Sequence, residues 1–169
     1  MSQLTRDLYV PYLDLNKGEG DTYDWCRIDK STVFEFSFNP SEETYGYIDS
    51  ANDTTLITSY AATMEQEIIL DNDNAMYAFM YEFCMGMPTG TSASIPALLA
   101  EPDSDGAVTR GRLWAEATVS PGSLNTVDGK LSFTINYNGT QTVGDVTYAD
   151  DGTVTFTEDA EEEETTDEG

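Results

Sequence analysis

Residues 130–138, Lys-Leu-Ser-Phe-Thr-Ile-Asn-Tyr-Asn, alternate between polar and apolar side chains without a break. The apolar members of the stretch are Leu131, Phe133, Ile135 and Tyr137. A period of two places successive side chains on opposite faces of a β-sheet. The stretch therefore predicts a strand with one buried and one solvated face.

Two other stretches alternate in the same way. Residues 32–38 place Phe34, Phe36 and Phe38 on one face, and Asn39-Pro40 ends the run. Residues 111–119 set Leu113, Ala115, Ala117 and Val119 against Arg112, Trp114, Glu116 and Thr118. Weaker strand patterns cover residues 63–70, 95–101, 142–148 and 153–157. Together the stretches predict a mainly β domain.

Glycine-containing dipeptides predict how these strands connect. Asn138-Gly139 is typical of a tight hairpin turn, so we expect the strand before it to fold straight back into residues 140 onward. Asp151-Gly152 precedes the last strand in the same way, and Asp128-Gly129 opens the strand at 130–138. The C-terminal third is therefore expected to be a meander.

One segment, residues 73–85, has the period of a helix instead. Its apolar residues, at i, i+3, i+4, i+7 and i+8, are Met76, Phe79, Met80, Phe83 and Cys84. Such a stripe is typical of a helix packed on a core. Residues 71–74 offer N-terminal caps, and Gly86 and Pro88 favour an end after residue 85.

The charge of the chain is strongly negative. Seven Lys and Arg oppose 32 Asp and Glu, which gives a formal charge of −25. Eight of these acids lie in residues 158–169, an acidic C-terminal tail that we expect to be disordered. Without the tail, 24 acids and seven bases still leave −17, so the domain itself is acidic. Tight binding to nucleic acid or to an anionic membrane is not expected of such a surface.

Several classes of chemistry lack the residues that they require. The chain has no histidine, which excludes Ser-His and Cys-His nucleophile systems and histidine metal sites. Its two cysteines, Cys26 and Cys84, have no CxxC spacing and are predicted to be buried thiols. The longest mostly apolar run, residues 75–88, is short for a membrane span, and the N-terminus does not resemble a signal peptide, so synthesis and retention in a cytoplasm are expected.

Clusters of acids are the remaining candidates for a site. Asp71, Asp73 and Glu82 match positions 1, 3 and 12 of an EF-hand loop, but the fifth ligand and the glycine of that loop are replaced. Glu65 and Glu67 share a strand face with a spacing that general acid–base pairs use, although solvated side chains are the expected outcome. We therefore predict no catalytic residue, no metal and no cofactor, and a protein that is not an enzyme.

Several runs, taken in order along the chain, resemble a known family. They are residues 6–14 (Arg-Asp-Leu-Tyr-Val-Pro-Tyr-Leu-Asp), 27–40, 47–49, 66–68 with the helix that follows, 87–90 (Met-Pro-Thr-Gly) and 122–134. This order resembles the major tail tube proteins of long-tailed (siphovirus-like) phages and prophages of Gram-positive hosts. It covers nearly the whole chain to about Phe156. Some family members append an immunoglobulin-like domain, whereas this chain ends in its acidic tail.

The resemblance implies a tail-tube-type β-sandwich or barrel subunit. It comprises residues 1–157, with an extended N-terminal arm (1–15), a long inter-subunit loop (39–62) and one flanking helix (73–85). Six copies would form a ring, and rings would stack into a tube whose inner wall is a continuous barrel. The implied partners are further copies of the chain, a tape measure protein, a tail terminator, and baseplate or distal tail proteins. Such a protein is assembled in the host cytoplasm and resides in the virion tail.

The arm and the loop have too little apolar patterning for a core of their own, so we expect them to become ordered against neighbouring copies. The candidate inter-subunit contacts are Leu8, Tyr9, Val10, Tyr12, Tyr45, Tyr47, Ile48 and Tyr60. The candidate lumen-facing residues are Glu65, Glu67, Trp114 and Glu116. An acidic lumen would repel double-stranded DNA toward the tube axis and let it pass without tight binding.

Two other functions stay open at this point. An acidic β-sandwich binding or adhesin module could use its many tyrosines as stacking platforms. A DNA mimic that blocks nucleic-acid enzymes would also account for the charge, although not for the arm and loop.

Overall fold

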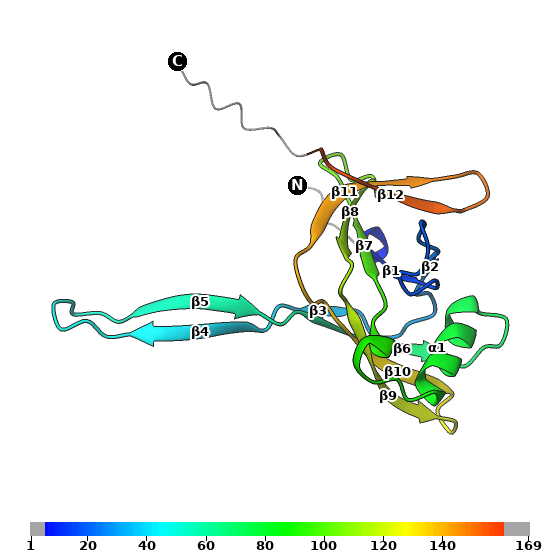
Figure 1. Cartoon of the computed structure of the whole chain (residues 1–169), viewed down its shortest axis with the longest axis horizontal. Helices are drawn as coiled ribbons and strands as arrows, with labels where there is room; N and C mark the ends of the chain where they lie inside the picture. The colour runs from blue at the N-terminus through cyan, green and yellow to red at the C-terminus, as the bar shows by residue number, and fades with distance from the viewer. Residues whose placement is uncertain (1–5, 161–169) are drawn as a thin grey trace, which may run out of the picture.

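The computed structural model describes residues 6–160, and the mainly β prediction is confirmed (Figure 1). A six-stranded antiparallel sheet has the order β12 (Val154–Glu158), β11 (Thr142–Tyr148), β8 (Arg110–Trp114), β7 (Ala97–Glu101), β1 (Val10–Asp14), β2 (Trp25–Arg27). A four-stranded antiparallel sheet has the order β3 (Glu35–Ser37), β6 (Thr63–Ile69), β10 (Lys130–Asn136), β9 (Thr118–Asn125). β4 (Pro40–Tyr45) and β5 (Thr54–Tyr60) pair only with each other. Short 3-10 helices cover Arg6–Leu8 and Gly90–Ala93.

The main core lies between the two sheets and under helix α1 (Ala75–Met85). β6 and β10 turn every second side chain inward, among them Met64, Ile68, Phe133 and Ile135. Trp114 and Tyr137 contact each other with tilted rings, whose centroids are 4.5 Å apart, and close the core beside β3. The strict alternation of residues 130–138 is therefore the pattern of a strand with one face on this core.

β1 corrects the expected N-terminal arm. All five residues of the strand are buried, and it pairs with β2 on one side and β7 on the other. Leu13 faces the main core, whereas Val10 and Tyr12 face a second core with Leu98 and Val146. A strand buried on both faces has no polar face, so its sequence shows no alternation. Residues 10–14 are thus integral to the sandwich, while residues 1–5 lie outside the described part.

Two of the connections at which the chain changes sheets correct a prediction. The alternating stretch 111–119 is broken by a turn at residues 115–116, which ends β8 in one sheet before β9 begins in the other. The Asn138-Gly139 turn leads from β10 to β11, which also lie in different sheets and do not pair. Gly139 does have a positive φ of 75°, but the turn is a crossover and not a hairpin.

The other two glycine turns are hairpins, as predicted. Gly129 (φ 68°) lies between the paired strands β9 and β10, and Gly152 (φ 87°) lies between the paired strands β11 and β12. β12 extends through Glu158, and Asp159 then forms an ion pair with Arg110. Residues 158–160, which the sequence assigned to a disordered tail, are therefore part of the described structure, and the rest of that prediction, residues 161–169, lies outside it.

Helix α1 confirms the predicted helix at 73–85. The Asn74 side chain caps it by accepting hydrogen bonds from the backbone N–H groups of Met76 and Tyr77. The side chains of Met76, Met80 and Phe83 are buried in the main core. Gly86 ends the helix in right-handed geometry, and Met87 after it takes the left-handed conformation, with φ 48°.

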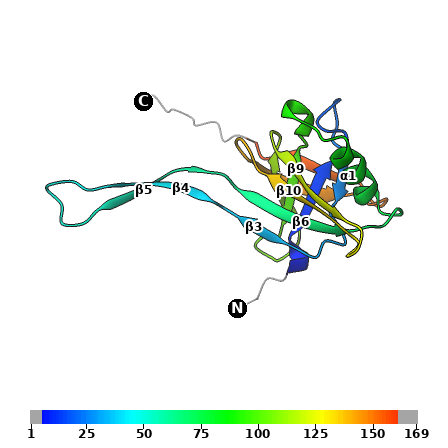
Figure 2. The same ribbon diagram turned by 90° about the horizontal axis from the view of Figure 1, so that it is seen from below.

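Residues 40–60, expected as a long polar loop, form a projecting hairpin. β4 and β5 extend away from both sheets, as Figures 1 and 2 show from two directions. Every residue of the two strands is exposed. We call this hairpin, residues 40–60, the arm.

Candidate assembly surfaces

The four-stranded sheet has one face that packs on the core and one that is polar across all four strands. The polar face consists mainly of Glu35, Ser37, Thr63, Glu65, Glu67, Thr118, Ser120, Lys130, Ser132, Thr134 and Asn136. Cross-strand hydrogen bonds tie these side chains together, such as Asn136 Nδ2 to Ser120 Oγ at 2.9 Å. We call this surface the polar face.

Glutamates give the polar face its charge. Glu67 lies 2.7 Å from Lys130 Nζ, and the hydrogen bonds from Lys130 and Thr32 hold the pKa of Glu67 below its usual range. Glu35 and Glu65 are directly opposite in register, and neither makes an ion pair within residues 6–160. Like charges placed opposite each other destabilise a strand pair. The polar face thus carries negative charge at Glu35 and Glu65 that does not stabilise the isolated chain.

The four candidate lumen residues divide into two pairs. Glu65 and Glu67 lie together on the polar face, as their strand pattern predicted. Trp114 does not, because it is buried between the sheets against Phe36 and Tyr137. Glu116 lies in the turn between β8 and β9, where its backbone carbonyl accepts a hydrogen bond from Asn138 Nδ2. The sheet change at residues 115–116 is the reason that Trp114 and Glu116 were misplaced.

The polar face ends in two strand edges, β3 and β9. Within residues 6–160, β3 pairs only with β6, and β9 pairs with β10 apart from an isolated bridge between Ser94 and Thr118. An unpaired edge presents backbone N–H and C=O groups that can hydrogen-bond another strand. The sheet therefore has hydrogen-bonding capacity on both sides.

Aromatic side chains lie beside the β3 edge. An apolar groove of about 400 Å³ opens there between the two sheets. Its apolar lining consists of Tyr9, Phe34, Phe36, Phe38, Leu99 and Trp114, and the Glu101–Arg112 ion pair borders it. Phe34 and Phe38 are exposed large apolar side chains. We call this surface the aromatic groove.

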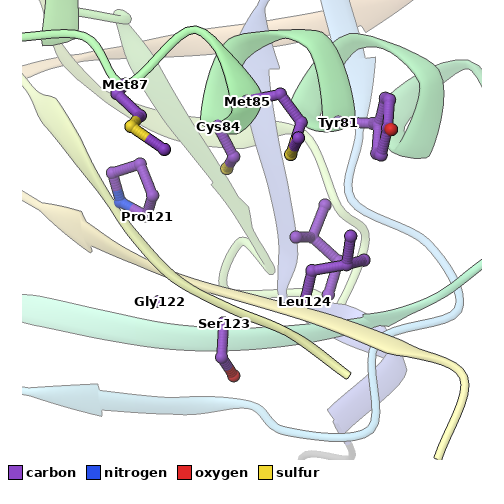
Figure 3. Close-up of a pocket in the computed structure, with 9 residues that line it drawn as sticks. Tyr81, Cys84, Met85, Met87, Pro121, Gly122, Ser123 and Leu124 are labelled. Atoms are coloured by element: carbon purple, nitrogen blue, oxygen red, sulfur yellow. The ribbon is translucent and has the colours of Figure 1, made fainter. Parts of the chain in front are cut away.

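Methionines lie beside the β9 edge. In Figure 3 the side chains of Cys84, Met85 and Met87 point from the end of α1 toward the segment that carries Pro121 and Leu124. These residues line a hollow of about 260 Å³, and Met87 is 77% exposed. We call this surface, formed by Met85, Met87, Pro121 and Leu124, the methionine patch.

The arm also carries exposed apolar side chains. These are Tyr45, Tyr47, Ile48, Leu56, Ile57 and Tyr60. A two-stranded hairpin without a core is marginally stable in water. Burial of these side chains against another surface would therefore stabilise the arm.

The candidate inter-subunit contacts differ in accessibility. Tyr45, Tyr47, Ile48 and Tyr60 are exposed on the arm, and Leu8 and Tyr9 are half-buried. Val10 and Tyr12 are buried in the second core, where burial and Tyr148 raise the pKa of Tyr12. Because this chain covers them itself, Val10 and Tyr12 do not offer a surface to a neighbour.

Asp71 and the two thiols, which were considered for chemistry, have structural surroundings that do not form a reactive site. Asp71 forms an ion pair with Lys30, which holds the pKa of Asp71 below its usual range. Among the described residues, no group of three His, Cys, Asp or Glu side chains could hold a metal ion. Cys26 and Cys84 are half-buried, and burial raises the pKa of each thiol to about 11. No helix within residues 6–160 has both the length and the apolar character to cross a bilayer.

Comparisons with known proteins find similarity at the level of structure. No family model matches the sequence, and no curated protein matches it. A structure of the sheath/tube terminator of the PVC extracellular contractile injection system in its extended state has a TM-score of 0.50 at 6% identity. The match covers 85% of this chain and 97% of the other.

Two other solved structures are less similar. A chain of the anti-feeding prophage cap, described as a tube terminating cap, has a TM-score of 0.49 at 12% identity, with 86% and 93% coverage. Hcp1 from Salmonella typhimurium has a TM-score of 0.34 at 14% identity, with 88% and 92% coverage. At such identities a likeness concerns the fold alone. The chain thus shares its fold with the sheath/tube terminator, which supports the tail-tube-type fold class that the sequence resemblance implied.

Two of the surfaces were not found from the sequence. Phe34, Phe36 and Phe38 were predicted to share one strand face, but the sequence did not show that only Phe36 reaches the core. The methionine patch had a visible signal, since residues 83–100 and 117–127 contain no acidic or basic side chain in a very acidic chain.

Proposed function

We propose that this chain is a structural subunit that assembles with identical copies into rings, and that the rings stack into a tube. The observation that carries the proposal is a polar sheet face bounded by the edges of β3 and β9, which no further strand of residues 6–160 continues apart from the bridge at Thr118. A sheet that continues from copy to copy satisfies both edges and makes the polar face a continuous inner wall. In this tube Glu35, Glu65 and Glu67 line the lumen.

The strand directions are compatible with such a ring. Adjacent strands of the four-stranded sheet are all antiparallel, so β3 and β9 run in opposite directions. Rotation of one copy about an axis beside the sheet therefore places an antiparallel β3 next to β9. Within one copy, Glu35, Glu65, Thr134 and Ser120 lie in one row across the four strands, so the polar face is continuous from β3 to β9. A head-to-tail contact of this type closes into a ring when the rotation allows it.

The arm provides the contact between rings. It extends beyond both sheets, carries exposed apolar side chains and needs a covering surface (Figure 2). Its Tyr45, Tyr47, Ile48 and Tyr60 contact subunits of the adjacent ring. Leu8 and Tyr9 precede β1, and Tyr9 lines the aromatic groove, so these residues border the contact between neighbouring copies of one ring.

The complete particle is the tail of a long-tailed phage or prophage of a Gram-positive host, with six copies in each ring. The tube ends on terminator and baseplate or distal tail proteins and encloses a tape measure protein during assembly. Genomic DNA then passes through the lumen during ejection. Since DNA carries one negative charge per about 1.7 Å of axis, a wall with unpaired glutamates repels it and prevents stalling.

Electron microscopy of the purified protein over a range of salt concentrations tests the proposal. Each copy carries a formal charge of −17 without its last twelve residues, so repulsion opposes assembly at low salt. We expect rings or hollow filaments that increase with ionic strength. A protein that stays monomeric at high concentration in every salt would refute the tube and favour the acidic binding module.

A further inference from the structure

The aromatic groove and the methionine patch are two apolar surfaces at opposite edges of one sheet. The groove lies beside β3, and the patch lies beside β9 and the end of α1. Each surface lies on the core side of its strand, since Phe36 contacts the main core from β3 and Leu131, which lines the hollow of the patch, contacts it from β10. We infer that the methionine patch of one copy docks into the aromatic groove of the next.

The inference rests on the proposed function, and geometry connects the two. When β9 of one copy pairs with β3 of the next, the layers behind the two strands also meet. That layer holds the methionine patch on the first copy and the aromatic groove on the second. The docked surfaces form a second, apolar contact behind the backbone hydrogen bonds of the joined sheet.

Charge limits where two copies can touch. Identical chains of strongly negative charge repel each other except where their surfaces are neutral. The patch comes from residues 83–100 and 117–127, which contain no acidic or basic side chain. The groove is also neutral, because its one acid, Glu101, lies 3.0 Å from Arg112. These surfaces can therefore meet without placing like charges together.

Met87 has two features that do not contribute to the stability of the monomer. It is 77% exposed, and its φ of 48° lies in the left-handed region, which side chains other than Gly, Asn and Asp adopt with strain. Backbone strain of this kind is concentrated at functional positions. A methionine is suited to an aromatic partner, because its flexible thioether fills irregular spaces and contacts ring edges favourably.

The test uses two single variants that each damage one surface. Met87→Asp places a charge on the patch, and Phe38→Asp places one in the groove; both side chains are exposed, so the monomer is expected to fold normally by circular dichroism. Thr147→Asp adds the same charge on exposed β11 as a control. Analytical ultracentrifugation then measures self-association of each protein.

We expect Met87→Asp and Phe38→Asp to raise the dissociation constant of the copy–copy contact at least about a hundredfold, since a charge is buried without a partner. Thr147→Asp should assemble like the wild type. An equimolar mixture of the two damaged variants retains one intact patch and one intact groove, so it should form a 1:1 dimer that does not grow.

Four results would overturn the inference. Assembly of Met87→Asp at wild-type strength would leave the tube standing and remove the docking contact. A mixture that stays monomeric would show that the two surfaces do not meet. Self-association that Ile48→Asp abolishes and Met87→Asp leaves intact would assign the groove to the arm. A wild-type protein that never associates would refute both the tube and this contact.

Discussion

Substitution of Met87 by asparagine should affect the monomer and the assembly in opposite directions. Asparagine adopts the left-handed backbone conformation readily, whereas another side chain there is strained by about 1 kcal/mol. Met87 is 77% exposed, so its remaining burial in the monomer is about a quarter of a methionine's full contribution, or roughly 0.5 kcal/mol. The monomer should therefore gain about 0.5 kcal/mol and melt about 1–2 °C higher.

The assembly should become weaker by the same substitution. A docked Met87 is removed from water, and loss of about 1.5 kcal/mol of burial per contact corresponds to roughly a tenfold increase in the dissociation constant. Thermal denaturation at low salt measures the monomer, and sedimentation at high salt measures the assembly. Met87→Leu, which keeps an apolar side chain and the strain, should resemble the wild type in both assays. A less stable Met87→Asn monomer, or one that assembles at wild-type strength, would refute the reasoning.

Other substitutions test the fold, the polar face and the arm. Gln66 is 1% exposed, and its amide has no hydrogen-bond partner within residues 6–160, so Gln66→Leu should stabilise the chain by about 1–2 kcal/mol in urea denaturation; a lower midpoint would show that water or a ligand satisfies the amide. Lys130→Gln should lower the free energy of unfolding at pH 7, because it removes the ion pair with Glu67. The pair lowers the pKa of Glu67 in the folded chain, so its contribution to stability is present above the pKa of Glu67 in the unfolded chain and is lost as Glu67 is protonated, below about pH 4. An equal difference in stability between variant and wild type at pH 7 and pH 3 would contradict the ion pair. Replacing residues 42–58 with a short glycine turn should give rings that do not stack in electron micrographs, and normal filaments would remove the arm from the contact between rings.

Local patterns identified the elements whose environment is simple. β10 has one face on the core and one in solvent, and α1 has one apolar stripe, so periodicity predicted both. The glycine turns before β10 and β12 were also correct, since they join neighbouring strands. In each case the structure depends on contacts close in sequence.

Elements that depend on distant contacts were harder to predict. β1 lies between two cores, which removes the polar face that alternation requires, and so it was interpreted as an arm that needs neighbours. The alternation of residues 111–119 continues through a change of sheet, so the sequence pattern gave Trp114 and Glu116 the wrong surroundings. The dipeptide Asn138-Gly139 specified the backbone conformation of Gly139 but not which strands it joins.

The candidate surfaces were predictable to different extents. Glu65 and Glu67 were placed on one strand face by spacing alone, and the structure adds Glu35 from a strand that pairs across a long sequence separation. The aromatic groove requires side chains from β3, β7 and β8 to meet Tyr9, which precedes β1, and no local pattern encodes this. The sequence therefore placed its phenylalanines on one strand face without showing which of them are exposed.

The central claim is that β3 and β9 complete one another between copies, and amide hydrogen exchange of monomer and assembly tests it most directly. Within Glu35–Ser37 and residues 120–125, the backbone amides that point away from the sheet should exchange quickly in the monomer and slow markedly in the assembly. Amides in the interior of β10, paired on both sides in either state, should change little. Equally fast exchange at both edges in assembled material would contradict the shared sheet.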